Sequence, residues 1–213
     1  MPIAVLVSGR GSNLQALIDA CAAPDFPARI VLVVSNVASA LALERATRAG
    51  IATAVLDHKK FPSREAFDEA MQARIVAAGA ELVCLAGFMR LLTPAFVNAF
   101  AGRMINVHPS LLPAFPGLHA HEKVIASGAR FSGATVHFVS AETDAGPIIV
   151  QTVVPVQAND TAESLAARVT ATEHKCYPQV VRWIAEGRVR IEGARVVIDG
   201  AATATAPLIN PLV

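Results

Sequence analysis

Short apolar runs recur along the chain and alternate with segments of helical periodicity. The runs are rich in β-branched residues and are bounded by Gly, Pro, Ser or Asn, as buried strands usually are. They cover residues 3–7, 30–34, 51–56, 82–86, 104–107, 135–139 and 148–154. Because most of these runs are apolar without alternation, we expect strands that are covered on both faces.

Four segments carry apolar residues at helical spacing. They cover residues 12–21, 39–49, 63–78 and 161–186. Gly50 and Gly79 directly follow the second and third segments, where helices commonly end, and Pro178 should kink the fourth. The order at the start of the chain is βαβαβαβ, which predicts an α/β fold of Rossmann-like type, with a mainly parallel central sheet and helices on both faces.

The length of the chain indicates one well-cored domain. The 213 residues contain no internal repeat and no stretch typical of a linker. We expect a single domain over residues 1–200, followed by a loose tail over residues 201–213, which carries no charge and is interrupted by proline. A chain of this length buries roughly 70% of its unfolded surface, so its core needs no disulfide or metal.

Charge and cysteine content narrow the class of protein further. The 18 Lys and Arg residues nearly balance the 17 Asp and Glu residues, which argues against a nucleic-acid binder. Cys21, Cys84 and Cys176 are odd in number and lie among apolar residues, which favours small core residues in a reducing compartment.

A membrane location is also disfavoured by the sequence. Residues 104–121 carry no Asp, Glu, Lys or Arg and reach spanning length, but three prolines and three histidines exclude a membrane helix there. The N-terminus shows no basic leader. We therefore expect a cytoplasmic protein with no membrane partner, either a monomer or a homodimer.

The first chemical motif, Ser8-Gly9-Arg10-Gly11-Ser12-Asn13, lies between the first predicted strand and helix. Free N–H groups at a helix start favour an anion, and glycine lets the backbone approach it closely. We interpret the motif as a site for a phosphate monoester on a small substrate; a tight turn in which Ser12 caps the helix is the alternative.

A dinucleotide site fits this turn poorly. Leu14 stands where the third glycine of the dinucleotide fingerprint belongs, and the second predicted strand ends in Ser35 and Asn36 without an acidic residue for a ribose. The Gly-Lys-Ser/Thr of a P-loop is missing as well.

The second motif is Asn106-Val107-His108-Pro109, at the end of a predicted strand. Residues i and i+2 of a strand point to the same side, so Asn106 and His108 should present an amide and an imidazole to one spot. Two such donors can stabilise an oxyanion during acyl transfer. A histidine that is merely hydrogen-bonded within the structure remains an alternative at this stage.

Four strings resemble the signatures of the phosphoribosylglycinamide formyltransferase family, whose members use 10-formyltetrahydrofolate. They are Ser8-Gly9-Arg10-Gly11-Ser12-Asn13-Leu14, Leu85-Ala86-Gly87-Phe88-Met89-Arg90, Asn106-Val107-His108-Pro109-Ser110-Leu111-Leu112-Pro113 and Asp144-Ala145-Gly146-Pro147. The resemblance extends over about residues 2–200 and implies the Rossmann-like formyltransferase fold. Related enzymes that formylate methionyl-tRNA or hydrolyse the same folate carry an additional domain, for which we expect no room in 213 residues.

The resemblance implies transfer of a formyl group from 10-formyltetrahydrofolate, a co-substrate, to the amine of a phosphoribosylglycinamide in purine (IMP) synthesis. It assigns catalysis to Asn106, His108 and Asp144. Asn106 would donate to the oxyanion, His108 would donate to the same oxygen or deliver a proton, and Asp144 would hold the charged imidazole. Without the resemblance, Asp144 would equally suit a turn residue beside Gly146 and Pro147.

The resemblance also assigns substrate contacts. For the ribonucleotide these are Gly11, Ser12, Asn13, Pro109, Thr170 and Glu173. Thr170 departs from the amide side chain that is common in the family, which puts that contact in doubt. Glu173 follows the apolar Val169 by four residues, so it should lie near a buried helix face, where an unpaired carboxylate is costly. A structural ion pair of Glu173 with a neighbouring Arg or Lys, such as Arg168, is the alternative.

The folate is assigned to the segment after the fourth predicted strand, to the loop of residues 140–144, and to Arg64 and Asn106 elsewhere. The residues are Arg64, Met89, Arg90, Leu91, Leu92, Asn106, Ser140, Ala141, Glu142, Thr143 and Asp144. Either of the two arginines would also suit an ordinary surface charge. His119, His121 and His137 should line the same crevice, with His119 and His137 as supports of the catalytic side chains. Histidines at i and i+2 without a nearby Cys or carboxylate set are poor zinc ligands, so we expect no metal.

Two other functions remain open from the sequence. One is a related enzyme, either a hydrolase of the same folate or a formyltransferase acting on another amine. The other is a noncatalytic sensor of a phosphorylated sugar, for which Asn106, His108 and Asp144 would have no use.

Overall fold

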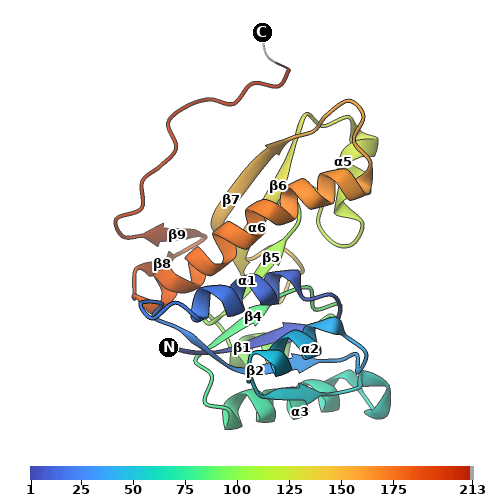
Figure 1. The fold of residues 1–213 in the computed structure, drawn as a ribbon, viewed down its shortest axis with the longest axis vertical. Helices are drawn as coiled ribbons and strands as arrows, with labels where there is room; N and C mark the ends of the chain where they lie inside the picture. Colours follow the sequence, from blue (N-terminus) through green and yellow to red (C-terminus); the bar gives the residue numbers. More distant parts are fainter. Residues whose placement is uncertain (212–213) are drawn as a thin grey trace.

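Seven strands form one central sheet in the order β3-β2-β1-β4-β5-β6-β7 (Figure 1). The computed structural model describes residues 1–211. The strands are β1 (Pro2–Val7), β2 (Arg29–Ser35), β3 (Thr53–Val55), β4 (Leu82–Leu85), β5 (Met104–His108), β6 (Phe131–Phe138) and β7 (Ile148–Pro155).

Six α-helices and one 3-10 turn are described around this sheet. They are α1 (Ser12–Cys21), α2 (Leu41–Arg48), the turn η1 (His58–Lys60), α3 (Arg64–Ala77), α4 (Pro94–Ala99), α5 (Ala120–Ser127) and α6 (Ala162–Ala185). A separate two-stranded hairpin, β8 (Val189–Glu192) and β9 (Arg195–Ile198), follows α6. Within residues 1–211, the helices are all too short or too polar to cross a membrane.

The sheet is parallel from β3 through β5, and β6 and β7 then pair antiparallel. In the paired register Leu6 of β1 lies opposite Leu85 of β4, and Leu85 lies opposite Asn106 of β5. The carboxyl ends of these three strands therefore meet at one edge. The mainly parallel α/β fold predicted from the sequence is confirmed.

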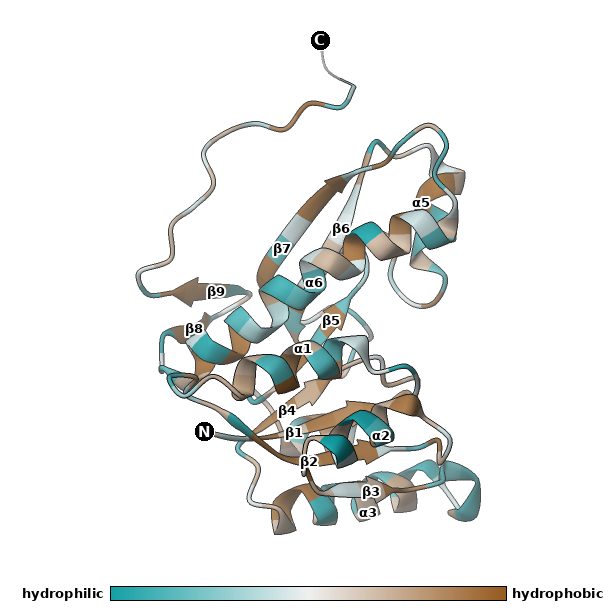
Figure 2. Ribbon diagram, viewed as in Figure 1, coloured by the Kyte–Doolittle hydropathy of each residue, from teal (hydrophilic) through white to brown (hydrophobic). Residues whose placement is uncertain are grey.

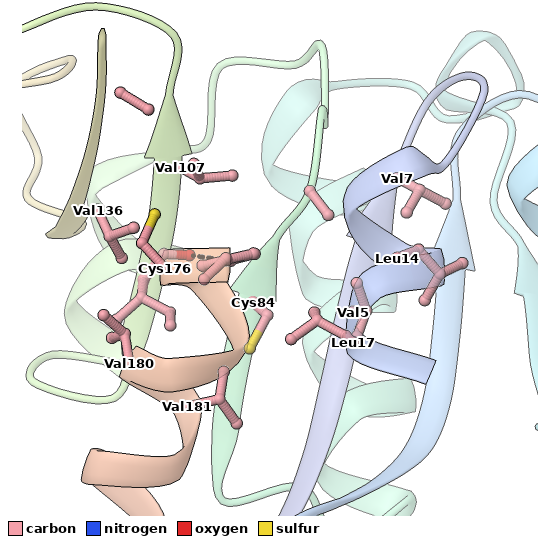
Figure 3. Packing of buried hydrophobic residues seen from close by; sticks show 14 of the residues in the cluster. Val5, Val7, Leu14, Leu17, Cys84, Val107, Val136, Cys176, Val180 and Val181 are labelled. Carbon is pink, nitrogen blue, oxygen red and sulfur yellow. Dashed lines mark hydrogen bonds between the residues drawn. The ribbon is translucent and has the colours of Figure 1, made fainter. Parts of the chain in front are cut away.

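Two apolar layers cover the sheet, one on each face. Ile3, Val5 and Val7 of β1 belong to one layer, together with residues of α1, α2, α5 and α6, whereas Ala4 and Leu6 belong to the other layer, with residues of α3 and α4. Figure 2 shows the parallel strands as hydrophobic and the outer side of α2 as hydrophilic. Figure 3 shows Cys84 of β4 in the first layer, among side chains of β1, α1 and α6. Apolar side chains of β1 point alternately to the two faces of the sheet, which is why helices cover both faces.

The helices predicted from periodicity are confirmed to within two residues at each end. α6 continues through Pro178. Sequence reasoning missed α4 and α5, which are only six and eight residues long, and the hairpin β8–β9. A weak signal existed for α4, because Thr93 caps it and Pro94 is its first residue.

The segment after β9, dark red in Figure 1, forms neither helix nor strand over residues 201–209. Beyond it, the Asn210 side chain donates a hydrogen bond to the Arg130 carbonyl oxygen at 2.6 Å. Residues 212–213 of the predicted tail lie outside the described residues. A single domain ending near residue 200 stays a prediction.

All three cysteine thiols are free. Burial raises the pKa of the Cys176 thiol to about 12 and that of Cys21 to about 11, so neither is a thiolate near neutral pH. Cys84 and Cys176 are buried in the core, as the sequence predicts, and Cys21 is half-buried.

One buried hydroxyl ties α6 to the parallel part of the sheet. Tyr177 is fully buried, and its hydroxyl lies 2.9 Å from the Leu85 carbonyl oxygen and 3.3 Å from that of Ile105. These carbonyls belong to β4 and β5, close to the ends where Asn106 and His108 stand.

We expect Tyr177→Phe, which keeps the packing but removes this donor, to lower the free energy of unfolding by about 1–2 kcal/mol in urea denaturation. An unchanged midpoint with an unchanged slope would contradict this role.

Candidate active site

A cavity of about 610 Å³ opens where β4 and β5 end. Its walls are the segment after β4, the end of β5 with the loop that follows, and the loop between β6 and β7. The described residues that line it include Phe88, Met89, Arg90, Leu91, Leu92, Asn106, His108, Pro109, Gly117, His119, His121, His137, Ser140, Ala141, Glu142, Thr143 and Asp144. Asn106 and His108 thus face one space, as their i and i+2 positions on a strand predict.

His108 and Asp144 form an ion pair inside this cavity. The His108 Nδ1 lies 3.4 Å from the Asp144 Oδ2, and both side chains are largely buried. The His108 Nε2 donates to the Phe115 carbonyl oxygen at 3.0 Å. Both ring nitrogens of His108 therefore face oxygen acceptors. Asp144 is itself held by the Gly117 N–H, which donates to its Oδ2 at 2.8 Å.

Asn106 is oriented by His137 on the neighbouring strand β6. The His137 Nδ1 donates to the Phe138 carbonyl oxygen at 2.9 Å, which leaves the Nε2 as an acceptor 3.3 Å from the Asn106 Nδ2. Burial lowers the pKa of His137 and so favours this neutral form. One N–H of the Asn106 amide is therefore used by His137, and the other is available to the cavity.

Thr135 of β6 fixes the loop that follows β5 through two hydrogen bonds. The Thr135 hydroxyl donates to the Ser110 carbonyl oxygen at 2.7 Å and accepts from the Leu112 N–H at 3.0 Å. The Ser110 hydroxyl in turn donates to the Ala114 carbonyl oxygen at 2.6 Å. These bonds set the path of the chain to Phe115, whose carbonyl meets His108.

The glycine-rich turn after β1 leads directly into α1. Gly11 has a φ of 72° and is the N-cap of α1, so the alternative in which Ser12 caps the helix is wrong. A Cβ at Gly11 would lie 2.6 Å from that of Ala42, which only glycine avoids. Among the described residues no side chain caps α1, and its first N–H groups point out of the helix end.

Asn13 and Glu173 meet beside this turn. The Asn13 Nδ2 donates to the Glu173 Oε2 at 2.8 Å, although 160 residues separate them. Glu173 is 5% exposed, and burial raises the pKa of its carboxyl. The alternative ion pair is wrong, because Glu173 forms no ion pair with any Arg or Lys among the described residues, and Arg168 binds Asp160 at 2.8 Å. The Asn13 Oδ1 is buried and has no partner among the described residues, which marks a place for a polar ligand.

The residues predicted for catalysis, for the folate and for the ribonucleotide lie in two places, the cavity and the region where α1 meets α6. All the residues assigned to the folate line the cavity except Arg64, which is exposed at the start of α3. Gly11, Ser12, Asn13, Thr170 and Glu173 lie outside its lining, at the start of α1 and on α6, whereas Pro109 belongs to the lining. Residues 1–211 contain no cluster of three or more His, Cys, Asp or Glu side chains arranged to hold a metal.

Sequence reasoning missed the backbone groups that hold the ion pair. The Phe115 carbonyl and the Gly117 N–H both come from the proline-rich loop after β5. Their only signal in the sequence is the string Phe115-Pro116-Gly117, which indicates a turn without indicating what it contacts.

An amide, an imidazole and a carboxylate lie together at the carboxyl edge of the open sheet. This arrangement defines an α/β enzyme with a centre suited to acyl transfer. Residues 1–181 match the family model described as formyl transferase. The chain belongs to the formyl transferase family, which confirms the resemblance seen in the sequence.

Individual relatives agree with this membership. The chain is 48% identical over 200 residues to phosphoribosylglycinamide formyltransferase of Escherichia coli K12, covering 94% of both chains. It is also 48% identical over 195 residues to the trifunctional purine biosynthetic protein adenosine-3 of Bos taurus, covering 91% of this chain and 19% of that protein. The crystal structure of glycinamide ribonucleotide transformylase 1 from Symbiobacterium toebii matches with a TM-score of 0.91 and 50% identity, over 93% of each chain.

The geometry of the glycine-rich turn predicts opposite outcomes for its two glycines. Gly11→Ala forces a side chain into positive φ and against Ala42, so we expect a loss of about 2–4 kcal/mol in the free energy of unfolding. Gly9 has open space around it, and Gly9→Ala should stay within about 1 kcal/mol of the natural protein. Urea denaturation of both variants checks this, and equal losses would refute the packing argument.

The raised pKa of Glu173 predicts a pH dependence of stability. The folded protein keeps the Glu173 proton above the ordinary Glu value of 4.5, so folding is favoured below that pH and loses this contribution as pH rises through the folded pKa. Glu173→Gln keeps an acceptor for Asn13 and removes the titration. The variant should therefore gain stability relative to the natural protein between pH 4 and pH 7, as measured by denaturation at each pH. A constant difference would contradict the buried carboxyl.

Proposed function

We propose that this chain transfers the formyl group of 10-formyltetrahydrofolate to the amine of N1-(5-phospho-D-ribosyl)glycinamide, in purine (IMP) synthesis. The names of its relatives support this reaction. The observation that carries the proposal is the convergence of Asn106, His108 and Asp144 in one cavity, next to a glycine-rich turn that suits a phosphate.

The chemistry follows from the geometry of these three residues. The substrate amine attacks the formyl carbon, and negative charge develops on the formyl oxygen. The free N–H of Asn106 donates to that oxygen, and protonated His108 places positive charge beside it. As the intermediate collapses, the bond from the formyl carbon to folate N10 breaks. His108 gives N10 the proton of the ring nitrogen that otherwise bonds the Phe115 carbonyl, and the proton that the attacking nitrogen loses returns to His108 through Asp144. Asp144 holds the imidazole in place throughout.

The ribonucleotide is assigned to the turn before α1 and to the facing part of α6. The N–H groups of Ser12 and Asn13 at the helix start suit the phosphate. The carboxyl of Glu173 accepts from the ribose hydroxyls, and the unpartnered Oδ1 of Asn13 accepts a further donor of the substrate. Pro109 belongs to the lining of the cavity, and Thr170 lies one turn before Glu173 on α6.

The folate is assigned to the cavity itself. Met89, Leu91 and Leu92 give it an apolar wall for a flat ring, and the backbone of residues 140–144 gives hydrogen-bonding groups at the ring edge. Arg90 at the same wall suits the anionic tail. Arg64 lies outside the lining, so its contact with the folate has the least support.

We also place the reaction in the reducing environment of the cytoplasm. The three free thiols support this, because cysteines in oxidising compartments usually pair.

One assay separates the proposal from its alternatives. Purified protein is mixed with 10-formyltetrahydrofolate, with and without phosphoribosylglycinamide, and loss of the formyl donor is followed. We expect loss that depends on the amine substrate. Loss without it would indicate a hydrolase, and no loss in either case would indicate a binding protein.

The ion pair predicts the effect of one substitution. Asp144→Asn removes the charge that holds His108, so kcat should fall by about 10²-fold or more while the Kd for phosphoribosylglycinamide stays within about twofold. Asp57→Asn is the matched control, because Asp57 also lies beside a histidine, at 4.0 Å from His58, but outside the cavity. Equal activity of the two variants would remove Asp144 from the mechanism.

A further inference from the structure

Two loops that the proposed function uses separately leave the sheet side by side. One is the glycine-rich turn after β1, and the other is the segment of residues 88–92 after β4, which lines the cavity. β1 and β4 are paired neighbours, and the Ser8 N–H donates to the Gly87 carbonyl oxygen at 3.1 Å. The backbone therefore brings the two loops together before any side chain is considered.

The Ser8 side chain adds a second bond between these loops. Its hydroxyl accepts from the Met89 N–H at 2.8 Å and donates to the Asn36 Oδ1 at 2.6 Å. Asn36 is 6% exposed and follows the last residue of β2. Because the hydroxyl has only one proton, the bond to Asn36 turns its lone pairs toward Met89. Asn36 stands where a dinucleotide-binding protein would place its acidic ribose ligand, and here it orients Ser8.

The segment is anchored at its other end as well. The Thr93 N–H donates to the Asp68 Oδ2 at 2.7 Å, and Asp68 is 3% exposed on α3. Between these anchors the side chains of Met89 and Leu91 are 60% and 62% exposed, so they are open to a ligand while the backbone beneath them is held. Ser8, Asn36 and Asp68 lie outside the described lining of the cavity.

We propose that Ser8, oriented by Asn36, is a positioning residue that fixes the segment 88–92 relative to the glycine-rich turn. The part of the cavity assigned to the folate and the part of the site assigned to the phosphate then keep one relative geometry, which the attack of the amine on the formyl carbon requires. The identity of the two ligands rests on the proposed function; the fixation of the segment does not.

The test compares Ser8→Ala with Ser35→Ala. Ser35 is fully buried one residue before Asn36, and its hydroxyl bonds the backbone of Val37, so its loss removes a similar hydroxyl without touching the segment. Hydrogen exchange of the Met89 amide, followed by NMR in the protein without ligand, should become about three- to tenfold faster in Ser8→Ala and stay unchanged in Ser35→Ala.

Kinetics test the consequence for the folate. In Ser8→Ala the KM for 10-formyltetrahydrofolate should rise about three- to tenfold, with kcat within about twofold, because the chemical groups themselves are intact. Ser8→Thr, which keeps the hydroxyl, should restore most of the KM. Ser35→Ala should leave KM unchanged even where its melting temperature falls.

Several outcomes would overturn the inference. Unchanged exchange at Met89 in Ser8→Ala removes the fixation itself. Faster exchange of the Met89 amide with an unchanged KM removes the role of Ser8 in binding the folate. An equal rise of KM in both alanine variants means that the effect of Ser8→Ala is general destabilisation. If the natural protein transfers no formyl group, the proposed function fails, while the exchange measurement still decides whether Ser8 fixes the segment.

Discussion

Parallel strands that pair side by side end at the same edge of a sheet, and in this chain β1, β4 and β5 are such neighbours. A different part of the proposed site lies at the end of each strand. The glycine-rich turn follows β1, the apolar wall of the cavity follows β4, and β5 carries Asn106 and His108. Without this pairing the proposed phosphate, folate and catalytic groups would belong to unrelated surfaces. The antiparallel strand β6 then adds His137 from the other side of β5, where it meets Asn106.

Several polar groups are buried at this edge, and most of them have hydrogen-bond partners among the described residues. Asp144 is held by His108 and by the Gly117 N–H, and Asn106 by His137. A buried polar group without a partner is costly, so the few that remain open indicate where a ligand completes the structure. The unpartnered oxygen of Asn13 beside the buried carboxyl of Glu173 is the clearest of these.

Much of the architecture could be predicted from the sequence, because apolar periodicity directly reports which face of an element is buried. The seven strands and the helices α1, α2, α3 and α6 follow from it, as does the shared direction of Asn106 and His108. The helices α4 and α5 were not found this way, because α4 has only six residues and α5 follows closely on the proline-rich loop after β5. Contacts such as Ser8 with Met89 and Asp144 with Gly117 join loops that are 81 and 27 residues apart, so they depend on the tertiary structure and leave no local pattern.

Helix α6 carries two side chains that contact different parts of the proposed site. Glu173 and Tyr177 are four residues apart and so lie on one face of the helix, the first beside Asn13 and the second against the carbonyls of Leu85 and Ile105. A single residue inserted between them would turn one by about 100° relative to the other. Within this turn of the helix the spacing of the two side chains is therefore as strictly set as their identity.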